Sequence, residues 1–297
     1  MRKLIKTCLL CLIGLSIIML SSCVKEFNAE KPIIVVSREV GSGTRDAFME
    51  LVYGSNFRDI ELPVTAVSQN STGAVLAKVK TDPQSIAYDS LGYITNDVKK
   101  LKVDGVACTI DNIADGSYKI SRPLSVVYKE EKMNALTNKF LEFLNSKQAQ
   151  ELINELGYVG DSTKTANYQT ITPLSGTIKV AGSTSLEPLM KELADLFNEF
   201  QPNVIIQIGG GGSGTGRNNV RDDVSDLGMV SSDVTPAQIT DMQSKGGNVL
   251  VYKVASDGIA IIVHKTNSND NITIAQLRAI YDKNSEVKYS NWLELYQ

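Results

Sequence analysis

The sequence is poor in the residues that metal centres and hydrolytic sites need most. It has four cysteines and one histidine in 297 residues. The cysteines show neither metal-ligand spacing nor a disulfide pattern, and Cys108 is interpreted as a small buried apolar residue. His264 ends an apolar run and is interpreted as a strand-end residue rather than a catalytic base. These shortages argue against a serine hydrolase and a metal-dependent phosphatase, so no catalytic residue, metal or cofactor is predicted.

Basic charge is also scarce. Thirty Lys and Arg residues face 33 Asp and Glu residues, which gives a net charge of −3 without any basic block. This balance argues against a nucleic-acid partner held through phosphate contacts. The glycine-rich stretch at residues 209–216, GGGGSGTG, continues with Arg217 and Asn218. It therefore lacks the lysine that a P-loop places against phosphates.

The N-terminus has the features of an export signal. Basic residues precede an apolar run at residues 9–19, and Leu20-Ser21-Ser22-Cys23 ends it. The tetrapeptide resembles the lipobox of bacterial lipoproteins, which implies a signal peptide over residues 1–22, a lipid such as palmitate on Cys23 and a tether over 23–31. The expected location is the outer face of the cell membrane. An ordinary signal peptide or a membrane anchor is the alternative, although the run is short for a span of about 20 residues.

Strand-like and helical patterns alternate through the rest of the chain, which favours an α/β fold. About 275 residues remain after the signal, enough for roughly two domains. Residues 160–175, a mostly polar stretch with four threonines, are interpreted as a linker. The clearest expected strand–helix pairs are residues 178–180 with 186–200, 204–208 with 217–223, 227–230 with 236–245, and 259–263 with 274–281.

Three expected strand-to-helix turns share one composition: residues 41–44 (GSGT), 182–185 (GSTS) and 209–216. A helix start exposes unpaired N–H groups and the positive end of the helix dipole. Glycine lets the backbone approach a ligand closely, so these turns predict an anion site. Arg38, four residues before Ser42, adds a cationic donor. The alternative is that these serines and threonines only cap helices.

Longer stretches around these turns carry a specific resemblance. They read REVGSGTRDAF, IAYDSLGYI, RPL with FLEFLNSKQAQELINELGYV, GTIKVAGSTSLEPLMKELADLFNEF, DLGMVSSDV and VASDGIAIIVHKTN. They are similar to the phosphate-binding proteins of bacterial high-affinity phosphate ABC transporters, over nearly everything after about residue 31. The resemblance implies a type II periplasmic-binding-protein fold. In such a fold two α/β lobes are joined by two crossing strands, and the ligand lies in the cleft between them.

The order of these motifs differs from that of the family. Family members begin at GTIKVAGSTS and reach RE-x-GSGT later, whereas here RE-x-GSGT comes first and GTIKVAGSTS follows Val159. This order predicts a circular permutation, which requires neighbouring ends and a cut in an exposed loop. Lys31 and Gln297 are then expected side by side, with the linker exposed and poor in contacts. A fragment of a tandem fusion or a mispredicted gene is the alternative.

The permutation also predicts the division into lobes. Residues 32–116 plus 254–297 are expected to form a split lobe that carries Arg38. Residues 117–253 are expected to form a continuous lobe that carries the GSTS and GGGGSGTG turns. Residues 255–258 are expected at a crossing or in a lobe core.

The resemblance implies a set of phosphate ligands. Arg38 would donate a bidentate, charge-assisted pair. An aspartate would accept the proton of HPO₄²⁻, which sulfate lacks, and the unpaired contact would cost sulfate about 1–3 kcal/mol. The implied ligand residues are Arg38, Ser42, Gly43, Thr44, Thr184, Ser185, Ser213 and Asp233. For the last of these, the serine beside the acid in GMVSSDV is the alternative ligand.

The implied function is a lipid-anchored, extracytoplasmic receptor that binds inorganic phosphate and delivers it to the permease of an ABC transporter. Two alternatives use the same anion site: an enzyme acting on phosphate esters, and a phosphate sensor or adhesive surface protein that does not transport. The sequence shows no nucleophile–base pair, which favours the receptor.

Overall fold

The structure is a computed structural model that describes residues 26–54, 57–170 and 173–296. The predicted signal peptide and the lipidation site at Cys23 lie outside the described residues. Within these three ranges, no helix combines the length and the apolar character that crossing a bilayer requires.

The chain folds as alternating strands and helices, as expected. The strands are β1 (Ile34–Arg38), β2 (Val67–Gln69), β3 (Ser85–Ser90), β4 (Val98–Val103), β5 (Ser121–Lys129), β6 (Ser175–Gly182), β7 (Asn203–Gly211), β8 (Leu227–Val230), β9 (Val249–His264) and β10 (Asn271–Ile272). The α-helices are α2 (Gly43–Tyr53), α3 (Thr72–Thr81), α4 (Ile110–Ala114), α5 (Ala135–Leu144), α6 (Lys147–Glu155), α7 (Glu187–Phe200), α8 (Ser213–Arg221), α9 (Pro236–Gln243), α10 (Ile274–Tyr281) and α11 (Trp292–Leu295). Three short 3-10 helices lie at Phe57–Asp59, Leu91–Tyr93 and Glu130–Lys132.

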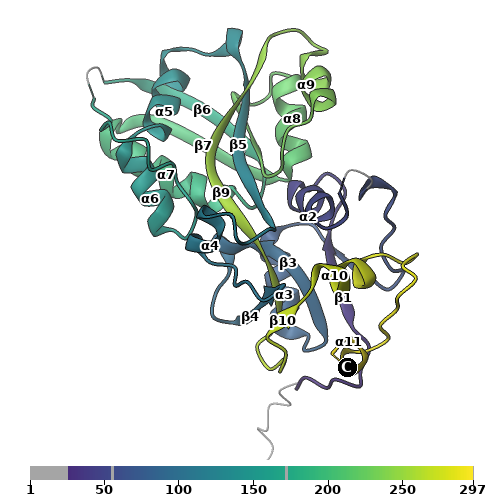
Figure 1. The fold of residues 1–297 in the computed structure, drawn as a ribbon. Helices are drawn as coiled ribbons and strands as arrows, with labels where there is room; N and C mark the ends of the chain where they lie inside the picture. The colour runs from purple at the N-terminus through teal and green to yellow at the C-terminus, as the bar shows by residue number, and fades with distance from the viewer. Residues whose placement is uncertain (1–25, 55–56, 171–172, 297) are drawn as a thin grey trace, which may run out of the picture.

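The strands form two groups, each with its own hydrophobic core. The order β2-β1-β3-β9 continues as β9-β5-β8-β6-β7. One core is built from side chains of residues 35–120 and 259–295. The other is built from side chains of residues 124–255, beside a smaller separate cluster that includes Val220 and Met242. We call these bodies the first lobe and the second lobe; Figure 1 shows them at the bottom and top of the molecule.

Two strands connect the lobes. The first half of β9 pairs with β5 in the second lobe, and its second half pairs with β3 and β4 in the first lobe. Beside the change of partner, Ile259 N donates to Ile120 O at 2.8 Å, just before β5 begins. Asp257, within the segment expected at a crossing, lies on β9 here, and its carboxylate pairs with buried Arg122 of β5 at 2.9 Å.

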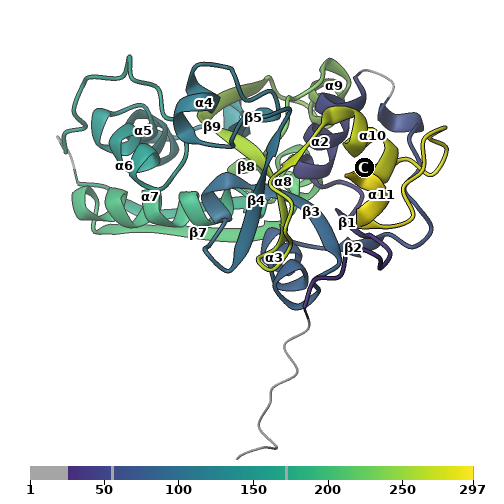
Figure 2. The ribbon, with the colours of Figure 1, turned by 60° about the horizontal axis from the view of Figure 1, so that its bottom comes forward.

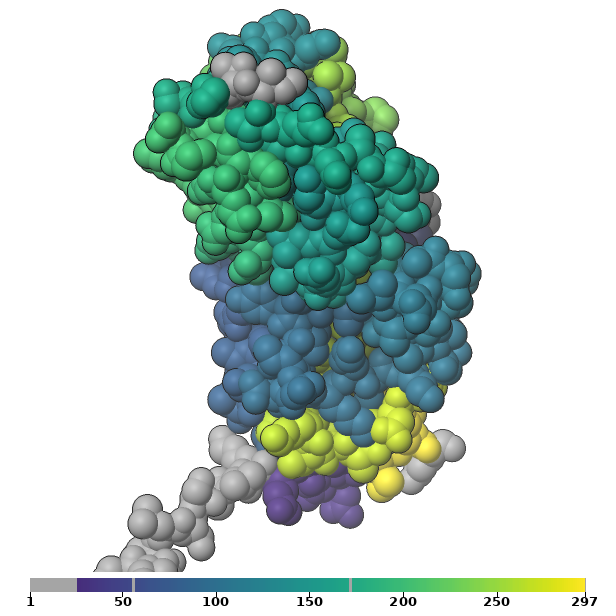
Figure 3. Space-filling model, turned by 90° about the vertical axis from the view of Figure 1, so that its left-hand side faces the viewer, coloured from purple at the N-terminus to yellow at the C-terminus, as the bar shows by residue number. Residues whose placement is uncertain are grey.

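The described ends of the chain lie together on the first lobe. Pro32 forms an antiparallel bridge with Asn291, and Leu293 N donates to Ala29 O at 2.8 Å. Figures 2 and 3 show the purple N-terminal residues beside the yellow C-terminal ones. The predicted proximity of the two ends is therefore present up to residue 296, while Gln297 lies outside the described residues.

The linker between the GYV and GTIKV motifs differs from expectation. Most of its described residues are exposed and irregular, but Tyr168 is buried against Phe143, Phe197 and Phe200. Lys147 N also donates to Ala166 O at 2.8 Å. The prediction of few contacts was wrong, because this segment contributes an aromatic ring to the second core.

Candidate functional site

Four helices begin where the two lobes meet: α2 and α3 from the first lobe, α7 and α8 from the second. Each follows the carboxyl end of a strand: β1, β2, β6 or β7. The first two starts are capped, because Ser42 Oγ accepts from Arg45 N and Ser71 Oγ accepts from Ala74 N. Gly212, with φ of 87°, gives α8 a start that a side chain would strain. Four positive dipole ends thus converge on one region.

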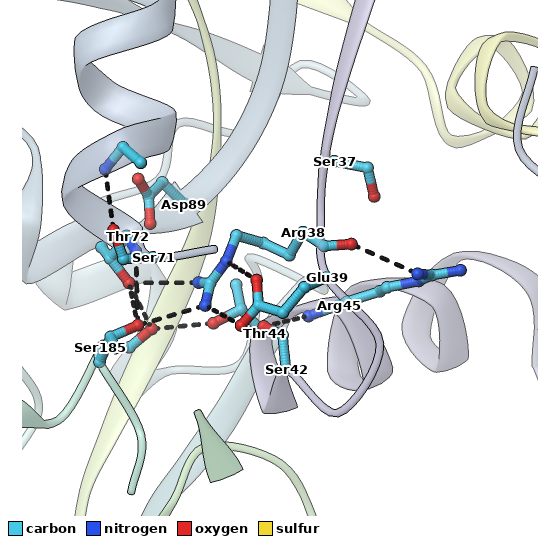
Figure 4. Close-up of polar contacts among 12 residues, drawn as sticks. Ser37, Arg38, Glu39, Ser42, Thr44, Arg45, Ser71, Thr72, Asp89 and Ser185 are labelled. Carbon is cyan, nitrogen blue, oxygen red and sulfur yellow. Dashed lines mark hydrogen bonds and ion pairs between the residues drawn. The ribbon is translucent and has the colours of Figure 1, made fainter. Parts of the chain in front are cut away.

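Arg38 lies at the centre of this region with 1% of its surface exposed. Its Nε and Nη2 each donate to the Glu39 carboxylate at 2.8 Å, which occupies the side-on edge of the guanidinium. The other edge faces the lobe boundary. Nη1 donates to Thr72 Oγ1 at 3.3 Å (Figure 4), and Nη2 donates to Thr184 Oγ1 at 3.2 Å. Glu39 therefore fixes the direction in which Arg38 presents its end-on donors.

Four hydroxyl groups form a cluster across the boundary. Thr44 and Thr72 belong to the first lobe, whereas Thr184 and Ser185 belong to the second. Thr44 Oγ1 lies 2.8 Å from Ser185 Oγ; Thr72 Oγ1 lies 3.1 Å from Ser185 Oγ and 3.2 Å from Thr184 Oγ1. We call Thr44, Thr72, Thr184 and Ser185 the hydroxyl cluster. A hydroxyl group can donate as well as accept, so either oxygen can be the donor in each of these three contacts.

A second contact extends the region along α8. Ser213 Oγ accepts from Ser231 N at 3.1 Å and lies 3.3 Å from Ser231 Oγ. A Cβ at Gly43 would overlap Ser213 Oγ and would lie 2.8 Å from Ser231 Oγ. Next to it, Gly214 N donates to Gly41 O across the boundary at 3.0 Å. The lobes therefore approach backbone to backbone here, which glycine permits.

The structure brings most of the predicted ligand residues to this region. They are Arg38, Ser42, Gly43, Thr44, Thr184, Ser185 and Ser213. Ser42 uses its side chain to cap α2, so its hydroxyl already has a structural partner. Asp233 is exposed, two residues beyond Ser231 in the turn after β8. Cys108 is buried and His264 ends β9, as interpreted from the sequence.

Four residues of the region were not in the predicted set: Glu39, Thr72, Asp89 and Ser231. Thr72 had a usable signal, because residues 68–72 (SQNST) form a fourth strand-to-helix turn that is also rich in hydroxyl residues. Ser231 belongs to the SSD motif from which only the acid was chosen. Asp89 lies inside a fully buried strand and has no local sequence signal.

Asp89 is a buried acid on β3, and Figure 4 shows it beside Thr72 of the hydroxyl cluster. None of its surface is exposed; Oδ1 accepts from Ser90 N at 2.9 Å, and Oδ2 has no partner among the described residues. Burial raises the pKa of Asp89 to about 8, while the Ser90 N–H, Arg38 and Arg122 oppose the rise. Asp89 can therefore bind or release a proton near neutral pH.

The region is rich in donors and has no recognisable catalytic apparatus. Within the described ranges, no group of three or more His, Cys, Asp or Glu residues could hold a metal ion. The hydroxyls are paired with each other and with Arg38, not with a histidine or lysine base. Such a set can bind an oxyanion from both lobes at once.

Comparison with known proteins gives consistent matches over nearly the whole chain. The pattern of the PBP superfamily domain matches residues 21–148 and 167–294. The phosphate-binding protein PstS 2 of Streptococcus pneumoniae TIGR4 is 36% identical over 279 residues, which is 91% of this chain and 92% of that protein. PstS 2 of Streptococcus agalactiae 2603 V/R is 33% identical, over 96% and 94% of the two chains.

A solved structure matches as well. It is the crystal structure of a phosphate-binding protein of a phosphate ABC transporter from Streptococcus pneumoniae TIGR4. It superposes with a TM-score of 0.68 at 33% identity, and the match covers 89% of this chain and 99% of that one. The relatives align end to end with this chain, so they carry the motifs in the same order.

Proposed function

This chain belongs to the PBP superfamily and, within it, to the phosphate-binding proteins of ABC transporters; from that premise we propose that it binds inorganic phosphate between its lobes and delivers it to a transporter permease. Its relatives are substrate-binding proteins, and the chain is a binding protein, not an enzyme. The observation that carries the proposal is the convergence of four helix starts and the end-on edge of Arg38 on one hydroxyl cluster.

The proposed ligands follow from that geometry. Arg38 offers Nη1 and Nη2 to one edge of the phosphate, and the hydroxyl cluster and Ser213 donate to the remaining oxygens. Charge-assisted hydrogen bonds are roughly twice as strong as neutral ones. Phosphate therefore replaces neutral hydroxyl–hydroxyl bonds with stronger contacts. Asp233, being exposed, remains only a predicted ligand.

Phosphate entry requires the lobes to separate. In the structure, the hydroxyls of Thr44 and Thr72 contact the Ser185 hydroxyl directly, so no room is left for an anion between them. Among the helices and strands of the described residues, β5 and β9 connect the lobes, so these two strands would bend if each lobe moved as a rigid body. We therefore propose that the lobes open slightly to admit the anion and close around it when it binds.

We further propose an extracytoplasmic location with a lipid on Cys23. This proposal rests on the residues before Cys23, because the described part begins at residue 26. A Cys23→Ser protein should leave the membrane fraction and still bind phosphate in solution. Retention of that variant in the membrane fraction would contradict lipid anchoring.

The direct test is isothermal titration of the mature protein with phosphate, sulfate and a phosphate monoester. Arg38→Ala removes both end-on donors and should weaken phosphate binding at least about 30-fold, or about 2 kcal/mol. Arg221→Ala is the matched control, because Arg221, the last residue of α8, pairs at the surface with Asp222 and with Asp241 of α9. A wild-type protein that does not bind phosphate, or an Arg38→Ala protein that binds it normally, would refute the proposal.

A further inference from the structure

A buried ion pair lies at the point where β9 changes its partner from the second lobe to the first. Arg122 of β5 stands opposite Asp257 of β9, and two residues later Ile259 stands opposite Ser90 of β3. Nη2 and Nε of Arg122 donate to Asp257 Oδ2 at 2.9 and 3.2 Å, and both side chains are almost fully buried. Replacing such a pair by apolar residues of similar size often costs a protein no stability. Stability alone therefore does not explain the pair.

The arginine has a further contact, which leads to the second-lobe half of the anion region. Nη1 of Arg122 donates to the carbonyl oxygen of Ser231 at 3.0 Å, directly after β8. The N–H of Ser231 in turn donates to Ser213 Oγ at 3.1 Å, at the start of α8. One planar guanidinium thus binds the Asp257 carboxylate and the Ser231 carbonyl together. It fixes the end of β8 relative to the strands that connect the lobes.

The aspartate contacts the other lobe. Asp257 Oδ1 accepts from the N–H of Leu91 at 3.1 Å, at the first residue of the 3-10 helix that follows β3. Tyr93, the last residue of this helix, lies against the start of α3, since a Cβ at Gly73 would be 3.1 Å from the Tyr93 hydroxyl oxygen. Gly73 directly follows Thr72 of the hydroxyl cluster. Asp257 therefore holds the turn that supports the first-lobe half of the anion region.

We propose that Arg122 and Asp257 are positioning residues, whose ion pair sets the two halves of the anion region relative to each other and does not itself bind the anion. This inference rests on the proposed phosphate-binding function. A site divided between two lobes binds tightly only when both sets of donors are in place at once. Displacement of one set lowers the binding-competent fraction of the protein, and the measured affinity falls by the same factor.

The first test separates positioning from stability. Arg122→Met combined with Asp257→Leu removes both charges together, so no buried charge is left without a partner. Thermal unfolding of this double variant should stay close to that of the wild type, whereas calorimetric titration should show phosphate binding weakened at least about tenfold. A merely structural pair would restore affinity together with stability. Lys129→Met is the control: Lys129 is a buried cation at the other end of β5, paired with Asp223, and its loss should leave phosphate affinity unchanged.

The second test asks whether Arg122 acts through Ser213. Arg122→Lys keeps a cation beside Asp257, but a single ammonium group lacks the fork that also binds the Ser231 carbonyl. It should weaken phosphate binding about fivefold. In a Ser213→Ala background the same substitution should weaken it less than about twofold, because the residue through which it acts is already altered. In a Thr44→Val background, which changes a first-lobe hydroxyl, the full fivefold effect should remain.

The outcomes distinguish this inference from the function on which it rests. A wild-type protein that does not bind phosphate refutes the proposed function. The inference is overturned, with that function intact, if the folded double variant binds phosphate as tightly as the wild type. It is also overturned if Arg122→Lys has the same effect with and without Ser213→Ala. Where thermal unfolding shows that a variant of one test does not fold, the other test decides.

Discussion

Gly43 lies where the two lobes touch, and its lack of a side chain is what allows the contact. A methyl group there would overlap Ser213 Oγ and crowd Ser231 Oγ. Gly43→Ala should therefore hold the lobes apart and weaken phosphate binding at least about tenfold, or about 1.4 kcal/mol. Titration measures the loss. Gly209→Ala is the matched control, because a Cβ at Gly209 meets nothing within 4 Å, and equal effects of the two substitutions would contradict this reading.

Single residues differ in how readily the sequence reveals them. Arg38 and Thr184 stand in turns whose composition is distinctive, and both were predicted. Ser231 is adjacent to a second serine and an acid, so sequence alone does not say which side chain faces the other lobe. Asp89 is harder still to identify from the sequence. What sets it apart is its burial near the charges of Arg38, Arg122 and Asp257, which three other strands supply. Only tertiary packing brings those charges together.

At the scale of one element, two neighbouring residues at the start of α3 have different roles, one in capping the helix and the other in the proposed phosphate site. Ser71 Oγ caps the helix through Ala74 N, while Thr72 Oγ1 contacts Arg38, Thr184 and Ser185. Ser71→Ala should cost about 1 kcal/mol of unfolding free energy and leave affinity nearly unchanged. Thr72→Val keeps the side-chain shape and should lower phosphate affinity about tenfold.

These two variants control for each other. Chemical unfolding gives the stability of each protein, and titration gives its affinity. If Ser71→Ala loses as much affinity as Thr72→Val, the hydroxyl of Thr72 acts through helix position rather than by direct contact.

The ends of helices and strands were predicted well where caps and apolar spacing are clear. They were predicted poorly where tertiary contacts extend a helix or strand beyond its sequence pattern. The helix at residues 274–281 matches α10, since its capping box and apolar spacing are both clear. By contrast α8 begins at Ser213, four residues earlier than predicted, because contacts across the lobe boundary override the low helix propensity of its glycines. The strand predicted at 259–263 is the second half of β9, which starts at Val249. The first half of β9 mixes exposed, half-buried and buried residues, whereas its second half is buried throughout, so the two halves have different sequence patterns.

For the whole molecule, the order in which the motifs follow one another along the chain can differ between proteins that pack the same elements in the same way. The relatives from Streptococcus share the motif order of this chain, since they align with it over more than nine-tenths of their length. We propose that this order is a circular permutation of the order that the resemblance implies for the rest of the family. The division into residues 32–116 plus 254–297 and residues 117–253 remains a proposal that agrees with the composition of the two cores.

Restoring the other order tests that proposal. A variant that starts at residue 174, runs to residue 296, continues through about six linker residues into residue 26 and ends at residue 170 keeps every described helix and strand and the Ala29 carbonyl that accepts from Leu293 N. Six residues reach up to about 20 Å, and the ends already meet through the Pro32–Asn291 bridge and the Leu293–Ala29 hydrogen bond. Since permutation changes connectivity and not packing, phosphate affinity should stay within about threefold, or about 0.7 kcal/mol, of the wild type.

A second permuted variant, ending at residue 159, shows whether the former linker is only a connection. It lacks Tyr168, whose ring packs against Phe143 and Phe197 in the second core. Loss of a buried aromatic side chain costs about 3–5 kcal/mol, so this variant should unfold at clearly lower denaturant concentration than the one ending at residue 170. Equal stability of the two would mean that Tyr168 contributes little to the core. Failure of both to bind phosphate, with both folded, would mean that the native order itself is needed to bring Arg38 and Thr184 together.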